Sequence, residues 1–186
     1  MVVGSTHGQT ASTANTGNST PNGGNSKGRA FFSLPWGFHS SEDHSQLQMQ
    51  IEYGHIFSEI PLFITPGLGY KNSTVWVATS SSPYYTNKKK YDFNYITIPI
   101  QLGYLIGDIE KIHASISGGA AWNYLISGKY DGSSLDLDGY KRSTWNGSLR
   151  FALGWKEYGI MAQYDFPFSS DSDGIWLFGI CFQGAI

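Results

Sequence analysis

The sequence predicts an all-β fold, an eight-stranded antiparallel up-and-down transmembrane β-barrel. Residues 95–106 alternate strictly between large apolar and small or polar side chains, and this period of two is typical of a β-strand. Segments with the same alternation recur from residue 29 to the end of the chain. The less apolar face of these segments carries few charges, which favours a filled interior with the aliphatic face toward lipid.

The predicted strands lie near 30–39, 46–57, 60–71, 95–106, 112–127, 143–155, 158–168 and 175–186. Each is long enough to cross a bilayer when tilted. In every strand, large apolar side chains occupy alternate positions. In chain order they are Phe32, Leu34, Trp36 and Phe38; Leu47, Met49, Ile51 and Tyr53; Ile60, Leu62, Ile64, Leu68 and Tyr70; the even positions 96–106; Ile112, Ile116, Trp122 and Tyr124; Trp145, Leu149, Phe151 and Leu153; Tyr158, Ile160, Tyr164 and Phe166; and Trp176, Phe178, Ile180 and Phe182.

The connections between these strands alternate in length. Tight turns are predicted at Ser58-Glu59, 107–111 and Lys156-Glu157. The segments 72–90 and 128–142 are long, and 40–45 and 169–174 are intermediate. Short turns at one rim and longer loops at the other are typical of outer-membrane barrels, in which the short turns are periplasmic. We therefore expect an outer-membrane location with both termini on the periplasmic side.

The composition narrows the functional classes. The 186 residues carry a formal net charge of −2, which gives no electrostatic basis for binding nucleic acid. Charged residues make up 14% of the chain, below the usual ~25%, and no stretch is apolar enough for a transmembrane helix. The single cysteine, Cys181, excludes an intramolecular disulfide and a cysteine-based zinc site. We expect no cofactor.

Residues 1–28 form a separate region in composition. They are rich in Gly, Ser, Thr and Asn and contain almost no large apolar side chains, so they cannot bury enough surface to offset the entropy of ordering. We predict a flexible tail here and one barrel domain over 29–186. The first residues lack the basic start and apolar core of a cleavable signal peptide, so an exported chain is expected to be a mature or engineered form.

A soluble barrel is the main alternative fold. A lipocalin-like barrel shows the same periodicity, but it turns its large apolar residues toward a ligand cavity and its polar residues toward water. A water-facing sheet surface carries many charges. Here the clear charges at strand centres are Glu52, Arg150 and Asp165 alone. The sequence therefore favours the membrane barrel, with an apolar-ligand-binding soluble barrel as the alternative.

Part of the sequence is similar to a known family. Residues Tyr95 to Leu102, with the core Tyr-Ile-Thr-Ile-Pro-Ile, resemble the Tyr-Leu-x-Ile-Pro-Leu motif of PorT-like outer-membrane β-barrel proteins. The Gly-rich stretch 118–128 resembles the following strand of that family. The resemblance covers most of residues 30–186 and implies a porin-family outer-membrane barrel. It also implies an accessory role in secretion for some members, and it provides no catalytic residues.

Three inward charges are candidates for an interior cluster. By parity Glu52, Arg150 and Asp165 point into the barrel at a similar depth. A buried charge cluster is costly unless it is fully paired. We interpret these residues as a structural plug of ion pairs and hydrogen bonds, with an ion or proton path as the weaker alternative.

Basic side chains concentrate at the long-loop rim. Next to Tyr91 and Tyr130, they could bind the phosphates of lipopolysaccharide or other outer-membrane lipids. A solvated charge run explains the same pattern. Tyrosine-rich loops also suit contact with other envelope proteins. The basic rim residues are Lys71, Lys88, Lys89, Lys90, Lys129, Lys141 and Arg142.

Two loops hold clusters of acidic or imidazole groups. The loop from His39 to His44 contains Glu42 and Asp43, but its spacing matches no strong metal motif. Residues Asp131, Asp136 and Asp138 lack EF-hand spacing for calcium. We expect no metal site. A rim enzyme acting on lipid would have only His39, His44 and Asp43 as candidates, so the sequence favours a non-enzymatic protein.

Overall fold

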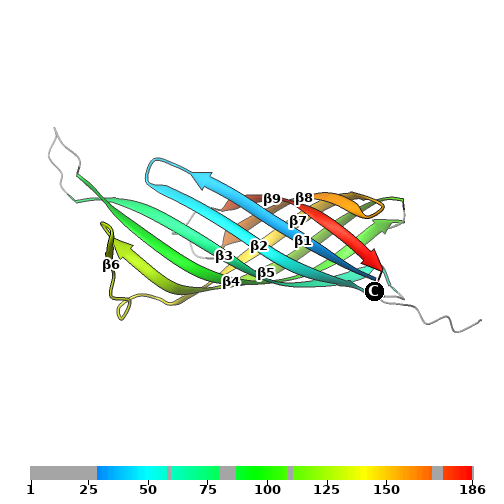
Figure 1. Ribbon diagram of the computed structural model, residues 1–186, viewed down its shortest axis with the longest axis horizontal. Coiled ribbons are helices and arrows are strands. Elements are labelled where there is room, and N and C mark those ends of the chain that lie inside the picture. Colours follow the sequence, from blue (N-terminus) through cyan, green and yellow to red (C-terminus); the bar gives the residue numbers. More distant parts are fainter. Residues whose placement is uncertain (1–28, 58–59, 80–86, 109–110, 169–173, 186) are drawn as a thin grey trace, which may run out of the picture.

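The computed structural model describes residues 29–57, 60–79, 87–108, 111–168 and 174–185. The predicted tail 1–28, the turn Ser58-Glu59 and most of the predicted loop 169–174 lie outside these ranges. Strands account for most of the described chain (Figure 1). They are β1 (Arg29–Ser40), β2 (His44–Ile56), β3 (Leu62–Ala78), β4 (Lys88–Gly107), β5 (Ile112–Tyr130), β6 (Ser133–Ser134), β7 (Ser143–Trp155), β8 (Tyr158–Pro167) and β9 (Ile175–Ala185).

The long strands form one closed antiparallel sheet. Each pairs with its neighbour in sequence, β5 pairs directly with β7, and β1 pairs with β9 to close the barrel. The two-residue strand β6 folds back only on the end of β5. The predicted eight-stranded up-and-down barrel is therefore confirmed. In register, Arg29 lies opposite Ala185, so the barrel begins and ends at the same rim, together with the short turns (Figure 1).

The outer surface of the barrel is apolar. Outward-facing side chains such as Trp36, Leu102 and Phe151 are at least half exposed, while the inward-facing Thr97, Gln101 and Glu52 are almost completely buried. Each strand thus turns its aliphatic and aromatic side chains away from the interior. The lipocalin-like alternative is wrong, because it needs this apolar face to line an internal cavity. A continuous apolar belt around a closed barrel is the surface expected in lipid.

Strands β3, β4 and β5 are longer than predicted. Strand β3 runs to Ala78 and β4 begins at Lys88, so the described part of the predicted loop 72–90 consists mostly of paired strands. Residues 80–86 of that loop lie outside the described ranges. Strand β5 continues to Tyr130, and the segment after it carries β6. Together these extensions form an external sheet, defined as residues 72–78, 88–94 and 127–130, that projects beyond the other strands (Figure 1).

The apolar face of the sheet changes sides where the external sheet begins. Along β4 the even positions from Ile96 to Ile106 face outward, whereas above Tyr95 the aromatic residues Tyr91 and Phe93 occupy the opposite face. The outward face there carries polar groups: Asn94 accepts a hydrogen bond from Asn72 Nδ2 at 2.8 Å. Such an inversion is expected where the surroundings of a barrel change from lipid to water.

The short-turn end of the interior is closed by rings packed on glycines. A Cβ on Gly54 would lie 2.2 Å from the Phe31 ring, and one on Gly103 would lie 2.1 Å from the Phe63 ring. The two phenylalanine rings meet edge to face, with centroids 5.3 Å apart. Together with Ile56 they form a buried apolar cluster. The glycines thus leave the space that the aromatic plug, defined as Phe31, Ile56 and Phe63, requires.

Candidate functional site

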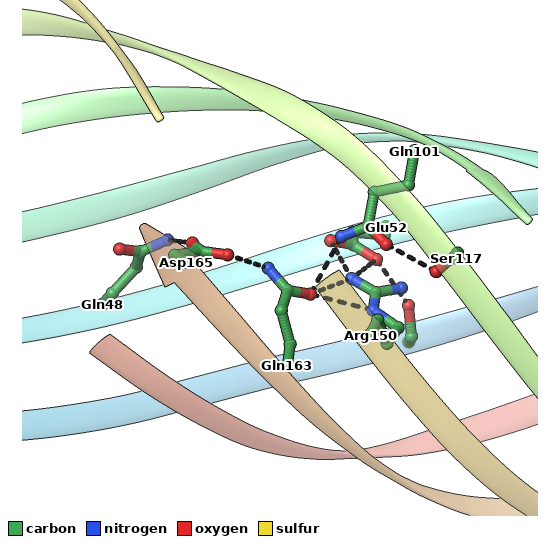
Figure 2. A network of polar contacts seen from close by, with 8 residues as sticks. Gln48, Glu52, Gln101, Ser117, Arg150, Gln163 and Asp165 are labelled. Atoms are coloured by element: carbon green, nitrogen blue, oxygen red, sulfur yellow. Dashed lines mark hydrogen bonds and ion pairs between the residues drawn. The ribbon is translucent and has the colours of Figure 1, made fainter. Parts of the chain in front are cut away.

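The centre of the lumen holds a buried polar network (Figure 2). Arg150 on β7 and Glu52 on β2 form an ion pair of 2.6 Å between Nη2 and the carboxylate, and their side chains are 3% and 0% exposed. Nη2 contacts both oxygens of Glu52, and Oε2 also accepts a hydrogen bond of 2.9 Å from Ser33 Oγ. This contact joins β1, β2 and β7 across the interior. The two charges are therefore compensated in a site that excludes bulk water.

Gln163 on β8 connects the ion pair to the rest of the network. Its Oε1 accepts a hydrogen bond of 2.8 Å from Arg150 Nε, and another from Nη2 of the same guanidinium. Gln101 Nε2 donates to the same oxygen at 2.9 Å, and Gln101 Oε1 accepts from Ser117 Oγ at 2.8 Å. One glutamine therefore links strands from opposite walls of the barrel.

Asp165 takes part in the network without directly contacting Arg150. Its two oxygens accept hydrogen bonds from Gln163 Nε2 at 2.6 Å and Gln48 Nε2 at 2.7 Å (Figure 2). The structure thus brings Glu52 and Arg150 together and joins Asp165 to them through Gln163. Alternation places Gln48, Gln101 and Gln163 on the inward face, but it does not by itself predict a role for these glutamines. An amide at mid-strand on the inward face is the signal that could have identified them.

A small cavity lies between this network and the aromatic plug. Its volume is about 30 Å³, and Arg150, His113, Met161 and Cys181 are among the residues that line it. A volume of that size holds roughly one to three water molecules. The interior is therefore filled by side chains at the level of Glu52 and again at the level of Phe31.

The predicted basic rim divides into three groups. Lys71 lies on β3 opposite Gln48 and Tyr95, so its side chain is on the inward face, with Nζ 5.8 Å from the centre of the Tyr95 ring. Lys89 also lies on the inward side, 4.8 Å from the Tyr130 ring, and a hydrogen bond with Tyr130 raises the pKa of Lys89. These two lysines are not on the outer surface of the external sheet.

The second group consists of basic residues that are paired with carboxylates. Lys88 Nζ lies 2.7 Å from Asp43 and 3.2 Å from Glu42, and these hydrogen bonds raise the pKa of Lys88. Lys90 lies 3.0 Å from Asp92, and Arg142 lies 3.2 Å from Asp138.

Lys129 and Lys141 form the third group, for which no ion pair is found within the described part of the chain. Lys129 lies opposite Asp92 on the outward face of the external sheet. The carboxylates around the rim therefore offset much of the positive charge that the sequence places there.

The acidic and imidazole loops make internal contacts. Asp43 bonds to Lys88, while a ring nitrogen of His44 lies 2.9 Å from Ser73 Oγ. The His39 and His44 rings lie with centroids 6.1 Å apart. Asp136 Oδ1 accepts a hydrogen bond of 3.1 Å from the backbone N–H of Asp138. In the ranges that the structure describes, no group of three or more His, Cys, Asp or Glu residues could hold a metal ion.

Comparison with known proteins agrees with this architecture. The family model described as "Outer membrane protein beta-barrel domain" matches residues 20–172. No curated protein matches at a significant level. No helix in the described ranges is long and apolar enough to span a membrane.

Two solved barrels illustrate the structural similarity. The N-terminal β-barrel domain of Pseudomonas aeruginosa OprF has a TM-score of 0.48 and 9% identity, covering 85% of this chain and 98% of that chain. Ail of Yersinia pestis, in complex with the heparin analogue sucrose octasulfate, has a TM-score of 0.47 and 15% identity, covering 85% of this chain and 99% of that one.

Proposed function

Because the chain belongs to the outer membrane protein beta-barrel domain family, we propose that it is a non-enzymatic barrel with a sealed lumen. It anchors the external sheet in an assembly of the cell envelope and contacts partner proteins through that sheet. Both termini are periplasmic in this proposal. The PorT-like motif at Tyr95 to Leu102 fits an accessory role of this kind.

The filled lumen is the observation that carries the proposal. The Glu52–Arg150 pair and the aromatic plug occupy the interior at two levels, so transport of large solutes through the barrel has no open path. Eight strands leave an interior that side chains just fill. A protein that does not conduct solutes has to act through the surfaces it presents. Among the described residues, the external sheet projects beyond the other strands (Figure 1).

The external sheet is built as a stable surface. On its inward side, Tyr91 and Tyr130 pack with ring centroids 4.9 Å apart, and Phe93 and Tyr140 with centroids 5.8 Å apart. Leu135 and Leu137 lie over Gly128, within 3.5 Å of the position of an added Cβ. This small aromatic core holds three strands in place outside the lipid, and its outward face stays accessible to a partner.

The experiment compares the native size of the protein with and without the external sheet. Outer membranes are extracted in mild detergent and run on native gels. The variant replaces residues 74–92 with a two-residue Asn-Gly turn. We expect the wild type to migrate well above the position of a single 20.5 kDa chain in its detergent micelle, and the variant to migrate at that position. A wild type that migrates as a single barrel would contradict the proposed assembly. Retention of a boiling-dependent gel shift verifies that the variant still forms its barrel.

Binding of lipopolysaccharide phosphates is a second candidate function, favoured by the position of Lys129. This lysine lies with Lys90 on the outward face of the external sheet, next to the level at which the apolar belt ends. Each lysine near an anionic surface contributes about 1 kcal/mol, so Lys90→Ala with Lys129→Ala should weaken binding by roughly thirtyfold. Lys89→Ala, on the opposite face, is the matched control. An equal loss of lipopolysaccharide binding in the Lys89→Ala variant would contradict this assignment.

A further inference from the structure

A groove lies in the apolar belt near the short-turn end. It has a volume of about 760 Å³ and lies along β7, β8 and β9 with the start of β5, strands that are neighbours in the sheet (Figure 1). The inward-facing Gly154, Gly159 and Cys181 line it together with outward-facing apolar side chains, so the strand backbone forms its floor. Sites for small molecules have volumes of about 300–1,000 Å³.

The groove is bounded by the most exposed apolar side chains of the described chain. Ile112 is 76% exposed and Ile160 is 66% exposed, and Trp155 and Tyr158 follow at 65% each. Ile180 and Phe182 complete the wall on β9. A lining of aliphatic and aromatic groups with almost no polar atoms fits a hydrocarbon chain. In a barrel surrounded by lipid, that chain is an acyl chain of a membrane lipid.

Two basic side chains lie where the groove meets the short turns. Lys156 follows Trp155, and its Nζ is 5.5 Å from the centre of the Trp155 ring. The backbone N–H of Lys156 donates a hydrogen bond of 2.9 Å to the carbonyl of Lys111, which holds the two turns side by side. Lys111 pairs with Asp108 at 3.4 Å, whereas Lys156 has no ion pair among the described residues.

From this arrangement we infer that the groove binds one phospholipid, with an acyl chain along Ile160 and the headgroup phosphate at Lys156 and Lys111. The tryptophan and tyrosine that flank the turn sit at the interface, where aromatic side chains anchor membrane proteins. A second copy of the chain is a poorer occupant, because its apolar belt would bring no phosphate to Lys156 and Lys111. This lipid site is separate from the external sheet, which lies at the opposite end of the barrel.

Native mass spectrometry of the intact protein tests the inference. The protein is purified in mild detergent, stripped of lipid, reloaded with palmitoyl-oleoyl phosphatidylethanolamine and exchanged again into detergent. We expect one retained phospholipid on the wild type. Ile160→Trp fills the groove and should abolish retention, whereas Ile98→Trp, at an outward position on β4, should leave it unchanged. A boiling-dependent gel shift confirms that each variant is folded.

The lysines separate a specific site from ordinary lipid contact. Lys111→Ala and Lys156→Ala should each lower retention about fivefold, in line with one charge near a phosphate. Equal retention in the wild type, the Ile160→Trp variant and the lysine variants would mean that the lipid is an unspecific part of the belt and would overturn the inference. Retention of an alkyl maltoside as strong as that of the phospholipid would overturn it as well.

Discussion

At the scale of single residues, the interior depends on compensated charge. Arg150 and Glu52 are both removed from water, and each is costly to bury without the other. The hydrogen bonds from Ser33 to Glu52 and from Arg150 to Gln163 satisfy further donors and acceptors of the pair. The network therefore fixes the relative position of three strands, and its loss should destabilise the whole barrel.

Replacement of Arg150 alone should destabilise the barrel more than replacement of both Arg150 and Glu52. Arg150→Met leaves Glu52 uncompensated and should lower the free energy of unfolding by about 3–5 kcal/mol. The double variant Arg150→Met with Glu52→Leu should recover most of that loss, because no lone charge remains. Urea unfolding in phospholipid vesicles, followed by the gel shift of the folded barrel, measures both. A double variant no more stable than the single one would refute the paired-charge account.

The glycines beneath the aromatic plug give a second prediction. Gly103→Ala places a Cβ 2.1 Å from the Phe63 ring and should destabilise the barrel by about 1–3 kcal/mol through overpacking. Gly118→Ala is the matched control, since its nearest neighbour is Leu149 Cδ2 at 3.5 Å. Urea unfolding distinguishes the two. If adding Phe63→Leu does not restore stability to the Gly103→Ala variant, a steric conflict with the Phe63 ring is not the cause of its destabilisation.

At the scale of elements, the external sheet combines an aromatic inner side with a charged outer side. Burial alone would raise the pKa of Asp92, but hydrogen bonds from Thr74 and Lys90, with the charges of Lys90 and Lys129, lower it below its usual 3.8. A carboxylate whose pKa is lower in the folded than in the unfolded chain stabilises the fold at pH values above its unfolded-state pKa. That contribution is lost as the pH falls through its folded-state pKa.

The external sheet should therefore loosen only in strong acid. The protection of the amides of residues 74–78 and 88–92 against exchange, relative to their intrinsic rates, should stay constant from neutral pH to about pH 4 in detergent micelles. It should fall below that pH, as Asp92 is protonated. Asp92→Asn should remove this acid-dependent step and leave exchange in the apolar belt unchanged. An identical acid response in the Asn variant would assign the effect to another carboxylate.

The same sheet shows where sequence reasoning reached its limit. Alternation of apolar residues identified the membrane part of β4, because one face there meets lipid. Above Tyr95 the outer face meets water, so the aliphatic signal ends although the strand continues. The aromatic residues Tyr91 and Phe93 still alternate with Asp92 and Asn94, and this reversed pattern was the available signal. The bulge between Asn94 and Tyr95, in the pairing with β5, adds to the break in the pattern.

At the scale of the whole molecule, the protein is a closed barrel with an apolar belt outside and packed side chains inside. The fold class, the facing of the strands and the alternation of short and long connections can be predicted from the sequence, because the side chains alternate with a period of two and the inner face carries few charges. Which side chains bond to one another in the lumen cannot be predicted in this way. Those contacts depend on the register between strands that are far apart in the sequence. Gln163 meets Gln101 across 62 positions of the chain, and no local pattern encodes that contact.

Planar-bilayer recording is the most direct test of the central claim that this barrel is sealed. Protein that shows the boiling-dependent gel shift is reconstituted at low density and held at several voltages. The filled lumen predicts a silent membrane, without openings on the nanosiemens scale of water-filled porins. Stable openings of that size from the wild type, absent in protein-free bilayers, would contradict a lumen closed by the Glu52–Arg150 network and the aromatic plug.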